Sequence, residues 1–193
     1  MTAETRRRRR PRPMTHDRLK RSAIHYLQRF PSSVRHFRTI MERKIKRAHG
    51  ECPGDEADYA EWLKAVEADC LQLGLLNDEL LAEALARSFN RRGSAIRQIR
   101  QRLRQKGFQA DCIDRSVRSL ELTVSEDRGV NTDLYGALRY AKRRRFGPFS
   151  RGESDWKVRQ KQMASLARRG FTYDVARTVI EMEADDERLD ILD

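Results

Sequence analysis

The sequence predicts an all-α fold, built as an elongated or curved array of three tandem three-helix repeats. Almost every segment from Asp17 onward has helical periodicity, and no stretch alternates apolar and polar residues as a strand does. Two helical patterns also recur at a spacing of about 60 residues, which is typical of repeat proteins. A unit this small buries little surface alone, so neighbouring units are expected to stack.

The first recurring pattern is an apolar stripe with i, i+3 and i+7 spacing on two helices. Its members are Val34, Phe37 and Met41 in one helix and, 62 residues later, Ile96, Ile99 and Leu103 in the other. Such spacing lines one face of a helix, so these side chains are expected to be buried. A serine before each run can cap the helix N-terminus: Ser32 or Ser33 in the first case and Ser94 in the second.

The second recurring pattern is a matched helix ending. The segment from Leu103 to Phe108 matches the segment from Leu166 to Phe171, 63 residues later. In both, a glycine is expected to supply the positive φ of a helix C-cap, and the following phenylalanine can pack back onto the last turn. Asp111 and Asp174 then stand near the start of the next helix, where a negative charge meets the positive end of the dipole.

These patterns predict four segments: a disordered basic arm at 1–16 and three-helix units at 17–76, 77–127 and 128–193. The arm is predicted from Arg6 to Arg10, Arg12 and two prolines, which repel one another or break helices; it could grip phosphates or be a solvated tail. The first unit is expected to contain a long third helix, Asp58 to Leu73, with Trp62, Val66 and Leu73 facing inward. The last unit ends in an acidic tail, Glu181 to Asp193.

Composition limits the classes of function. The net charge of +12 makes a polyanion, and nucleic acid in particular, the expected partner, although a basic charge can also serve only solubility. The 3 cysteines and 4 histidines lack zinc-like spacing, so we expect free thiols, no metal, no cofactor and a reducing cytoplasm. No apolar run is long enough to cross a membrane, and no secretory signal is visible. A phosphate loop, a paired-histidine helix and a nucleophile elbow are all missing, so an enzyme is not expected.

The candidate binding residues are basic and lie in two stretches without acids. The segment 85–106 carries Arg87, Arg91, Arg92, Arg97, Arg100, Arg102, Arg104 and Lys106. The segment 137–151 contributes Arg139, Lys142, Arg143, Arg144 and Arg145, and Arg168 and Arg169 precede the last glycine cap. A helix facing only water would normally intersperse acids, so an external polyanion is expected here, with a solvated face as the alternative. Arg97, Arg100 and Arg104 should form one outer stripe.

Other segments leave alternatives open. Phe146 and Phe149 could stack on bases, although packing between repeats is the more natural role. The acidic stretches 51–69 and 181–193 could touch basic surfaces of a partner protein or keep the protein soluble.

An ordered set of segments resembles the RecX regulatory family across residues 17–180. They are Ala23 to Leu27, Leu73 to Asp78, the Arg-rich segment with Lys106-Gly107-Phe108, and Arg168 to Phe171. The resemblance implies an α-helical array of three-helix repeats, without catalytic residues, that binds the RecA recombinase filament on single-stranded DNA. It further implies modulation, mostly inhibition, of recombinase, ATPase and co-protease activity in DNA repair and the SOS response.

From the basic stretches alone, bare DNA is expected to bind weakly and without sequence choice, because arginine contacts to phosphate carry no sequence information. The resemblance implies that this DNA is single-stranded. We expect a monomer. A different class stays open: a stand-alone DNA- or RNA-binding protein that uses helix-turn-helix-like units, or a component of a ribonucleoprotein.

Overall fold

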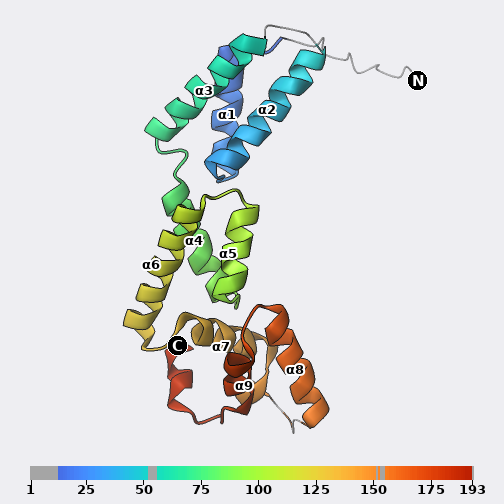
Figure 1. The fold of residues 1–193 in the computed structure, drawn as a ribbon, viewed down its shortest axis with the longest axis vertical. Helices are drawn as coiled ribbons and strands as arrows, with labels where there is room; N and C mark the ends of the chain where they lie inside the picture. The colour runs from blue at the N-terminus through green and yellow to red at the C-terminus, as the bar shows by residue number, and fades with distance from the viewer. Residues whose placement is uncertain (1–12, 52–55, 151, 153–154, 193) are drawn as a thin grey trace, which may run out of the picture. The chain divides into compact units, whose positions relative to one another are not determined.

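The computed structural model describes residues 13–51, 56–150, 152 and 155–192. All regular structure in these ranges is helical, which confirms the predicted all-α class. The chain divides into two compact units, unit 1 (Met1–Asn77) and unit 2 (Asp78–Asp193) (Figure 1). Unit 1 contains α1 (His16–Arg29), α2 (Val34–Glu51) and α3 (Glu56–Gln72). Unit 2 contains α4 (Asp78–Arg91), α5 (Ile96–Gln105), α6 (Ala110–Arg128), α7 (Thr132–Arg144), the 3-10 turn η1 (Gly147–Phe149), α8 (Trp156–Arg168), α9 (Tyr173–Glu181) and η2 (Glu187–Leu192).

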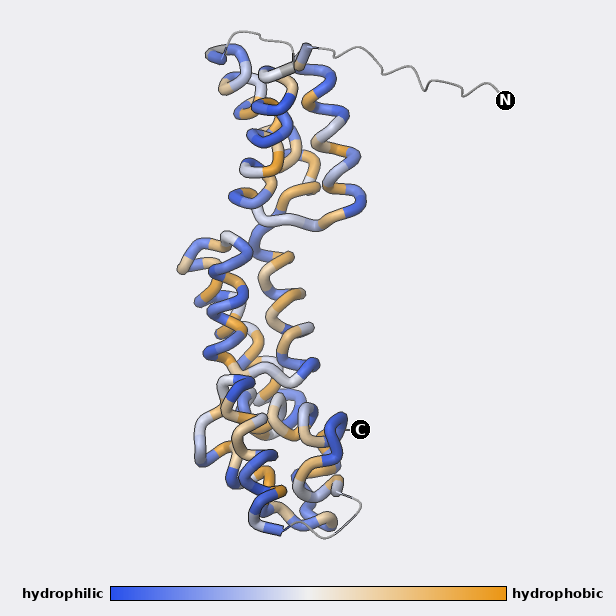
Figure 2. The backbone as a smooth tube through the Cα atoms, turned by 90° about the vertical axis from the view of Figure 1, so that its right-hand side faces the viewer, coloured by the Kyte–Doolittle hydropathy of each residue, from blue (hydrophilic) through white to orange (hydrophobic). Residues whose placement is uncertain are grey.

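The core of unit 1 forms between three amphipathic helices. Phe37 and Met41 are fully buried, and Val34 packs at the edge of the same cluster, so the predicted stripe of α2 is confirmed. Ser33 caps α2, because its Oγ accepts the backbone N–H of His36 at 3.3 Å. Apolar positions recur along each helix of the backbone tube, as an amphipathic helix requires (Figure 2).

The end of α3 departs from the prediction. Val66 is buried and Trp62 packs partly against the core, but Leu73 is 64% exposed. The helix ends at Gln72, and Gly74 turns the chain with φ +67°. Beyond this turn the helical period no longer sets which side chains face inward, so Leu76, 2% exposed, enters the core in place of Leu73.

Acids of α3 form ion pairs within unit 1. Asp69 accepts a hydrogen bond from Lys20 Nζ of α1 at 2.6 Å, and Glu67 holds the guanidinium of Arg38 of α2 through two hydrogen bonds of 2.6 and 2.9 Å. The Lys20 ammonium lowers the pKa of Asp69 below its usual value. Part of the acidic stretch 51–69 therefore joins the helices of unit 1 to one another.

The predicted basic arm, residues 1–16, includes residues that belong to unit 1. Met14 is buried in the core of unit 1, and Thr15 caps α1 by accepting the backbone N–H of Arg18 at 3.3 Å. The arm therefore ends before Met14, because an apolar side chain at that position has a core to enter. Residues 1–12 lie outside the described residues.

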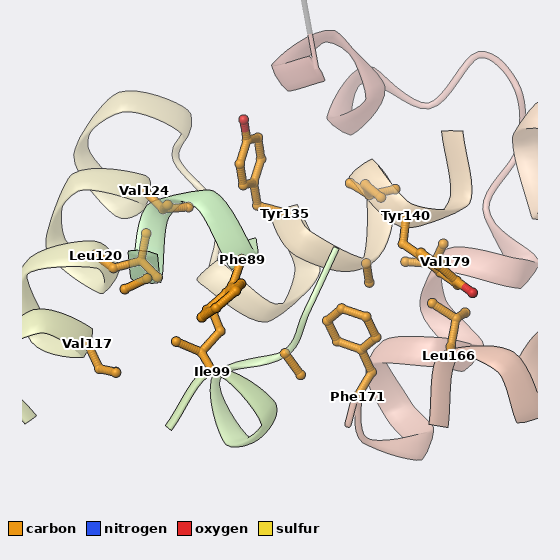
Figure 3. Close-up of a cluster of buried hydrophobic side chains, with 14 of the residues drawn as sticks. Phe89, Ile99, Val117, Leu120, Val124, Tyr135, Tyr140, Leu166, Phe171 and Val179 are labelled. Atoms are coloured by element: carbon orange, nitrogen blue, oxygen red, sulfur yellow. The ribbon is translucent and has the colours of Figure 1, made fainter. Parts of the chain in front are cut away.

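Unit 2 has one hydrophobic core that runs through α4 to α9. Phe89 of α4, Ile99 of α5, Leu120 of α6, Tyr135 of α7 and Phe171 before α9 belong to the same buried cluster (Figure 3). The helices follow one another as the triplets α4–α6 and α7–α9. The predicted boundary at 127/128 falls at the end of α6 but does not separate two cores, so the division of unit 2 into two repeats stays a prediction.

The matched helix endings of α5 and α8 are confirmed. Gly107 and Gly170 both have φ +89°. The N–H of Phe108 donates to Leu103 O at 3.3 Å, and the N–H of Phe171 donates to Leu166 O at 3.4 Å. Both phenylalanine side chains are buried. This is the Schellman arrangement, in which glycine supplies the left-handed backbone and the next side chain closes the apolar end of the helix.

The end of the chain packs onto unit 2. Leu192 of η2 is buried, and η2 contacts α7. Arg128 Nη1 of α6 also donates to Ile191 O at 3.0 Å. The acidic segment 181–192 therefore ends in a turn that packs against unit 2. Its leucine and isoleucine side chains contact the hydrophobic core, while its carboxylates contribute nothing to that apolar contact.

Candidate nucleic-acid interface

All the predicted binding residues lie in unit 2. Arg87 and Arg91 are on α4, Arg92 lies in the turn after it, and α5 carries Arg97, Arg100, Arg102 and Arg104, followed by Lys106. Arg139, Lys142, Arg143 and Arg144 belong to α7, Arg145 is its C-cap, and Arg168 and Arg169 end α8. Because α5, α7 and α8 belong to one compact unit, residues from both predicted basic stretches can act on the same surface.

The start of α5 is held by contacts from distant parts of the sequence. The residue before it, Ala95, makes no side-chain cap, and Ser94 is fully buried, so the predicted capping role of Ser94 is wrong. Instead, Oδ1 of Asp133, in the first turn of α7, accepts the backbone N–H of Ile96 at 2.8 Å. Ser94 Oγ is oriented toward another partner, Arg102 Nη1, at 3.2 Å. A carboxylate from another helix therefore satisfies a free N–H at this helix start.

The buried surroundings of Asp133 affect its titration. Burial raises the pKa of this carboxyl, and the hydrogen bond from Ile96 N–H offsets only part of that effect.

The end of α8 also packs against the start of α5, and we call this region the junction. Ala95 N–H donates to Arg169 O at 3.2 Å, and Gln98 Nε2 donates to Arg168 O at 3.2 Å. These contacts bring the Arg168–Arg169 segment against the first turn of α5.

Four arginines gather at this junction, and we call Arg92, Arg102, Arg143 and Arg169 the arginine cluster. The guanidinium of Arg102 lies 5.1 Å from the centroid of the Phe89 ring. Those of Arg143 and Arg169 lie 5.6 and 4.8 Å from the centroid of the Tyr140 ring. Arg143 Nη2 also donates to the backbone oxygen of Arg92 at 2.9 Å. Cation–π contacts at these distances hold the guanidinium groups in place without neutralising them.

The positive charges of the arginine cluster repel one another. Burial lowers the pKa of Arg102, and the positive charges of Arg169 and Arg92 lower it further. For Tyr140, burial raises the pKa, but hydrogen bonding by Ser165 and Arg169 and the positive charges of Arg169 and Arg144 lower it below its ordinary value overall. Since like charges held close together repel, a bound anion would relieve this strain and so would be favoured here.

The predicted outer stripe on α5 is only partly correct. Arg97 and Arg104 are exposed, but Arg100 forms an ion pair with Asp114 of α6. The 85–106 segment lacks acids in sequence, yet α6 packs beside α5 and supplies one. Arg100 therefore has a partner inside the fold and is a weaker candidate for contact with an external anion.

Other predicted residues are tied to neighbours outside the arginine cluster. Arg87 pairs with Glu83 one turn earlier on α4 at 3.4 Å. Arg139 lies 5.8 Å from the centroid of the Tyr135 ring. Arg145 is exposed at the end of α7 and takes the left-handed φ of +57°, which a non-glycine residue rarely adopts. These residues add positive charge to unit 2 without joining the cluster.

The two phenylalanines of the Phe146–Phe149 turn pack inward. Both are half-buried against the core of unit 2, and the Phe146 ring meets the Tyr140 ring edge-on at a centroid distance of 5.9 Å. Packing, rather than base stacking, is therefore the role that the structure gives them. Phe146 also supports the ring beneath Arg143 and Arg169.

Several residues of this site could not be recognised from the basic character of the two stretches. Asp133, Gln98 and Tyr140 hold α5, α7 and the end of α8 to one another, but their roles depend on partners 25 to 70 residues away. A further basic surface at the start of α8, around Trp156, was also missed. Its signal was available in the sequence, where α8 contains lysines and arginines but no acid.

Three comparisons place the chain among known proteins. Residues 132–180 match the family description "RecX, third three-helix domain". The regulatory protein RecX of Myxococcus xanthus is 30% identical over 173 residues, covering 89% of each chain. The regulatory protein RecX of Agrobacterium fabrum is 32% identical over 117 residues, covering 61% of this chain and 57% of its own.

The fold agrees with a solved structure. The crystal structure of RecX from Lactobacillus salivarius matches 91% of this chain and 97% of its own with a TM-score of 0.58, at 18% identity. Among the described residues, no helix is both long and apolar enough to cross a membrane. Because the similarity to the Myxococcus protein extends over nearly all of both sequences, the chain belongs to the RecX family of regulatory proteins.

Proposed function

We propose that this protein binds the RecA recombinase filament on single-stranded DNA and restrains its activity in DNA repair and the SOS response, without catalysing a reaction of its own. The family assignment supports a regulatory role, since the relatives are named regulatory proteins. The observation that carries the proposal is the arginine cluster, in which like charges from α5, α7 and the end of α8 converge and, within the part of the chain that the structure describes, form no ion pair with a carboxylate.

The physical mechanism is electrostatic bridging. A recombinase filament presents phosphates and acidic side chains at a regular repeat, and guanidinium groups form charge-assisted hydrogen bonds with both. Arginines held by Phe89 and Tyr140 lose less freedom on binding than flexible ones do. Several such contacts from one protein can span neighbouring protomers, so modest binding energy at filament ends suffices to stop growth.

The test is single-stranded-DNA-dependent ATP hydrolysis by the cognate recombinase as the protein is titrated in. The variant Arg97→Glu/Arg104→Glu reverses two exposed charges of α5. It spares Arg100, because a glutamate there would face Asp114 and destabilise the fold. We expect at least about a tenfold loss of inhibitory potency, which corresponds to roughly 1.4 kcal/mol. Circular dichroism should show unchanged helix content.

The matched control is Arg43→Glu/Arg47→Glu, which makes the same change of charge at two exposed positions of α2 in unit 1. It should inhibit nearly as well as the natural protein. Full inhibition by a folded Arg97→Glu/Arg104→Glu protein would remove the exposed Arg97–Arg104 face of α5 from the mechanism, and would leave Arg102 as the contribution of α5. Equal affinity for bare DNA and for recombinase-coated DNA, with no effect on ATP hydrolysis, would instead favour the stand-alone nucleic-acid-binding function.

A further inference from the structure

The first turns of α8 expose a large aromatic side chain among cations. Trp156 is 63% exposed and Val158 is 40% exposed. Lys157, Arg159 and Lys161 are all exposed as well. We call Trp156, Lys157, Arg159 and Lys161 the Trp156 surface. In Figure 1, α8 lies beside α9 in unit 2.

Packing of unit 2 does not account for this surface. The residues that α8 buries, Gln162, Ser165 and Leu166, lie further along the helix. Helix geometry places Arg159, three residues on, beside Trp156, while Lys157 and Lys161 form the adjacent stripe four residues apart. An indole left in water forgoes the burial of roughly 150–250 Å² that an aromatic side chain can gain. What distinguishes Trp156 from other exposed apolar side chains is the set of three exposed cations around it, and this combination favours an external partner.

The charges of the Trp156 surface are unbalanced. The sequence of α8 contains no acidic residue. Among the described residues, no carboxylate pairs with Lys157, Arg159 or Lys161. The nearest acid along the chain, Asp155, caps the helix by accepting the N–H of Val158 at 2.7 Å. The partner expected from these charges is therefore a polyanion.

We propose that the Trp156 surface is a contact for single-stranded DNA, in which the indole stacks on a base and Lys157, Arg159 and Lys161 bind the flanking phosphates. A flat, exposed aromatic surface beside cations suits a strand whose bases are unpaired, whereas a duplex hides the faces of its bases. An acidic peptide would satisfy the cations but would leave the indole without a stacking partner. The inference rests on the proposed function, because it names the DNA-contacting surface of a protein acting on a DNA-bound filament.

The experiment uses the full chain with Trp62→Phe, so that Trp156 is the only one of the 2 tryptophans left. Adding oligo(dT) should quench the fluorescence of Trp156, because a stacked base deactivates the excited indole. Trp156→Ala should weaken oligo(dT) binding, measured by anisotropy of a labelled oligonucleotide, by about five- to a hundredfold. Trp156→Phe should keep most of the affinity. An abasic oligonucleotide should bind the natural protein and the Trp156→Ala variant equally weakly.

Matched variants separate stacking from charge. Tyr173→Ala removes an aromatic side chain that is 69% exposed but is followed by Asp174 rather than by a lysine, and it should leave binding unchanged. Lys157→Glu/Lys161→Glu should reduce the slope of log affinity against log salt by about 1.4, because roughly 0.7 is lost for each phosphate contact on a single strand.

Three results would overturn the inference: unchanged oligo(dT) affinity in Trp156→Ala, binding without quenching, or equal quenching by poly-glutamate, which would indicate an acidic protein partner. The proposed function is tested separately. If the protein binds oligo(dT) through Trp156 but leaves recombinase ATP hydrolysis unchanged, the DNA contact stands and the regulatory function fails. If inhibition persists while Trp156→Ala binds oligo(dT) as the natural protein does, the reverse holds.

Discussion

The turn between α4 and α5 allows a direct test of how unit 2 is assembled. Gly93 has φ +70°, and a Cβ added there would lie 2.4 Å from Cβ and 2.9 Å from Cα of Tyr140. It would also lie 3.1 Å from the backbone oxygen of Gly136, so α7 as a whole would have to move away. Gly129 offers a matched control in the same unit, because its φ is +65° but no atom lies within 4 Å of the added Cβ.

Gly129→Ala should cost up to about 1 kcal/mol, since the strain of a left-handed alanine is partly offset by a less flexible unfolded chain. Gly93→Ala carries the same backbone cost and adds an overlap with α7. Overpacking of this kind costs about 1–3 kcal/mol, and here the overlap includes backbone atoms, which cannot change rotamer. The free energy of unfolding of unit 2 should therefore be lower in Gly93→Ala than in Gly129→Ala by about 1–3 kcal/mol.

The assay is urea unfolding followed by circular dichroism in a Trp156→Phe background. Fluorescence of Trp62, in α3, then reports unit 1 separately and should not change. In thermal unfolding, the same difference corresponds to a Tm lower by about 4 °C for each kcal/mol. A difference below about 0.5 kcal/mol between the two variants would refute the close approach of the Gly93 turn to α7.

Three further predictions follow from the same unit and from the arm. Leu103→Ala, which empties a fully buried position of α5, should lower the free energy of unfolding by about 2–5 kcal/mol, with Ile96→Ala, only partly buried, as the milder control. Because burial raises the pKa of Asp133 above its unfolded value, the folded state holds this proton to higher pH, so the carboxyl's contribution to stability falls as pH rises from about 4 through the folded pKa. Asp133→Asn keeps the acceptor for Ile96 N–H and should abolish this pH dependence. Asp133→Ala should abolish it as well and should be about 1 kcal/mol less stable than Asp133→Asn at every pH, as urea titrations at pH 4 to 7 would show. Removing residues 1–12 should reduce inhibition of recombinase ATP hydrolysis less than Arg97→Glu/Arg104→Glu does, because so basic and proline-containing a segment is expected to lose conformational entropy for each contact it makes. A greater loss on removing the arm would place the binding site there.

Much of the fold could be predicted because its signals are local. The apolar stripes of α2 and α5 and the Gly-Phe endings of α5 and α8 depend on residues within one or two turns of each other. Helical period and left-handed C-caps act at that range, so the sequence alone determined the all-helical class and the repeated helix ends. The net charge and the order of the family-like segments were equally independent of packing.

The tertiary structure decided which basic residues are available. Arg100 and Arg97 look alike in the sequence, but only Arg100 meets Asp114 when α6 packs beside α5. Likewise, Asp133 became the cap of α5 although 37 residues separate it from Ile96. Each of these partners comes from another helix, and the sequence of one helix does not specify which side chains a neighbour will bring within hydrogen-bonding distance. Charge and helicity can therefore be predicted from the sequence, whereas the pairing of those charges depends on how the helices pack.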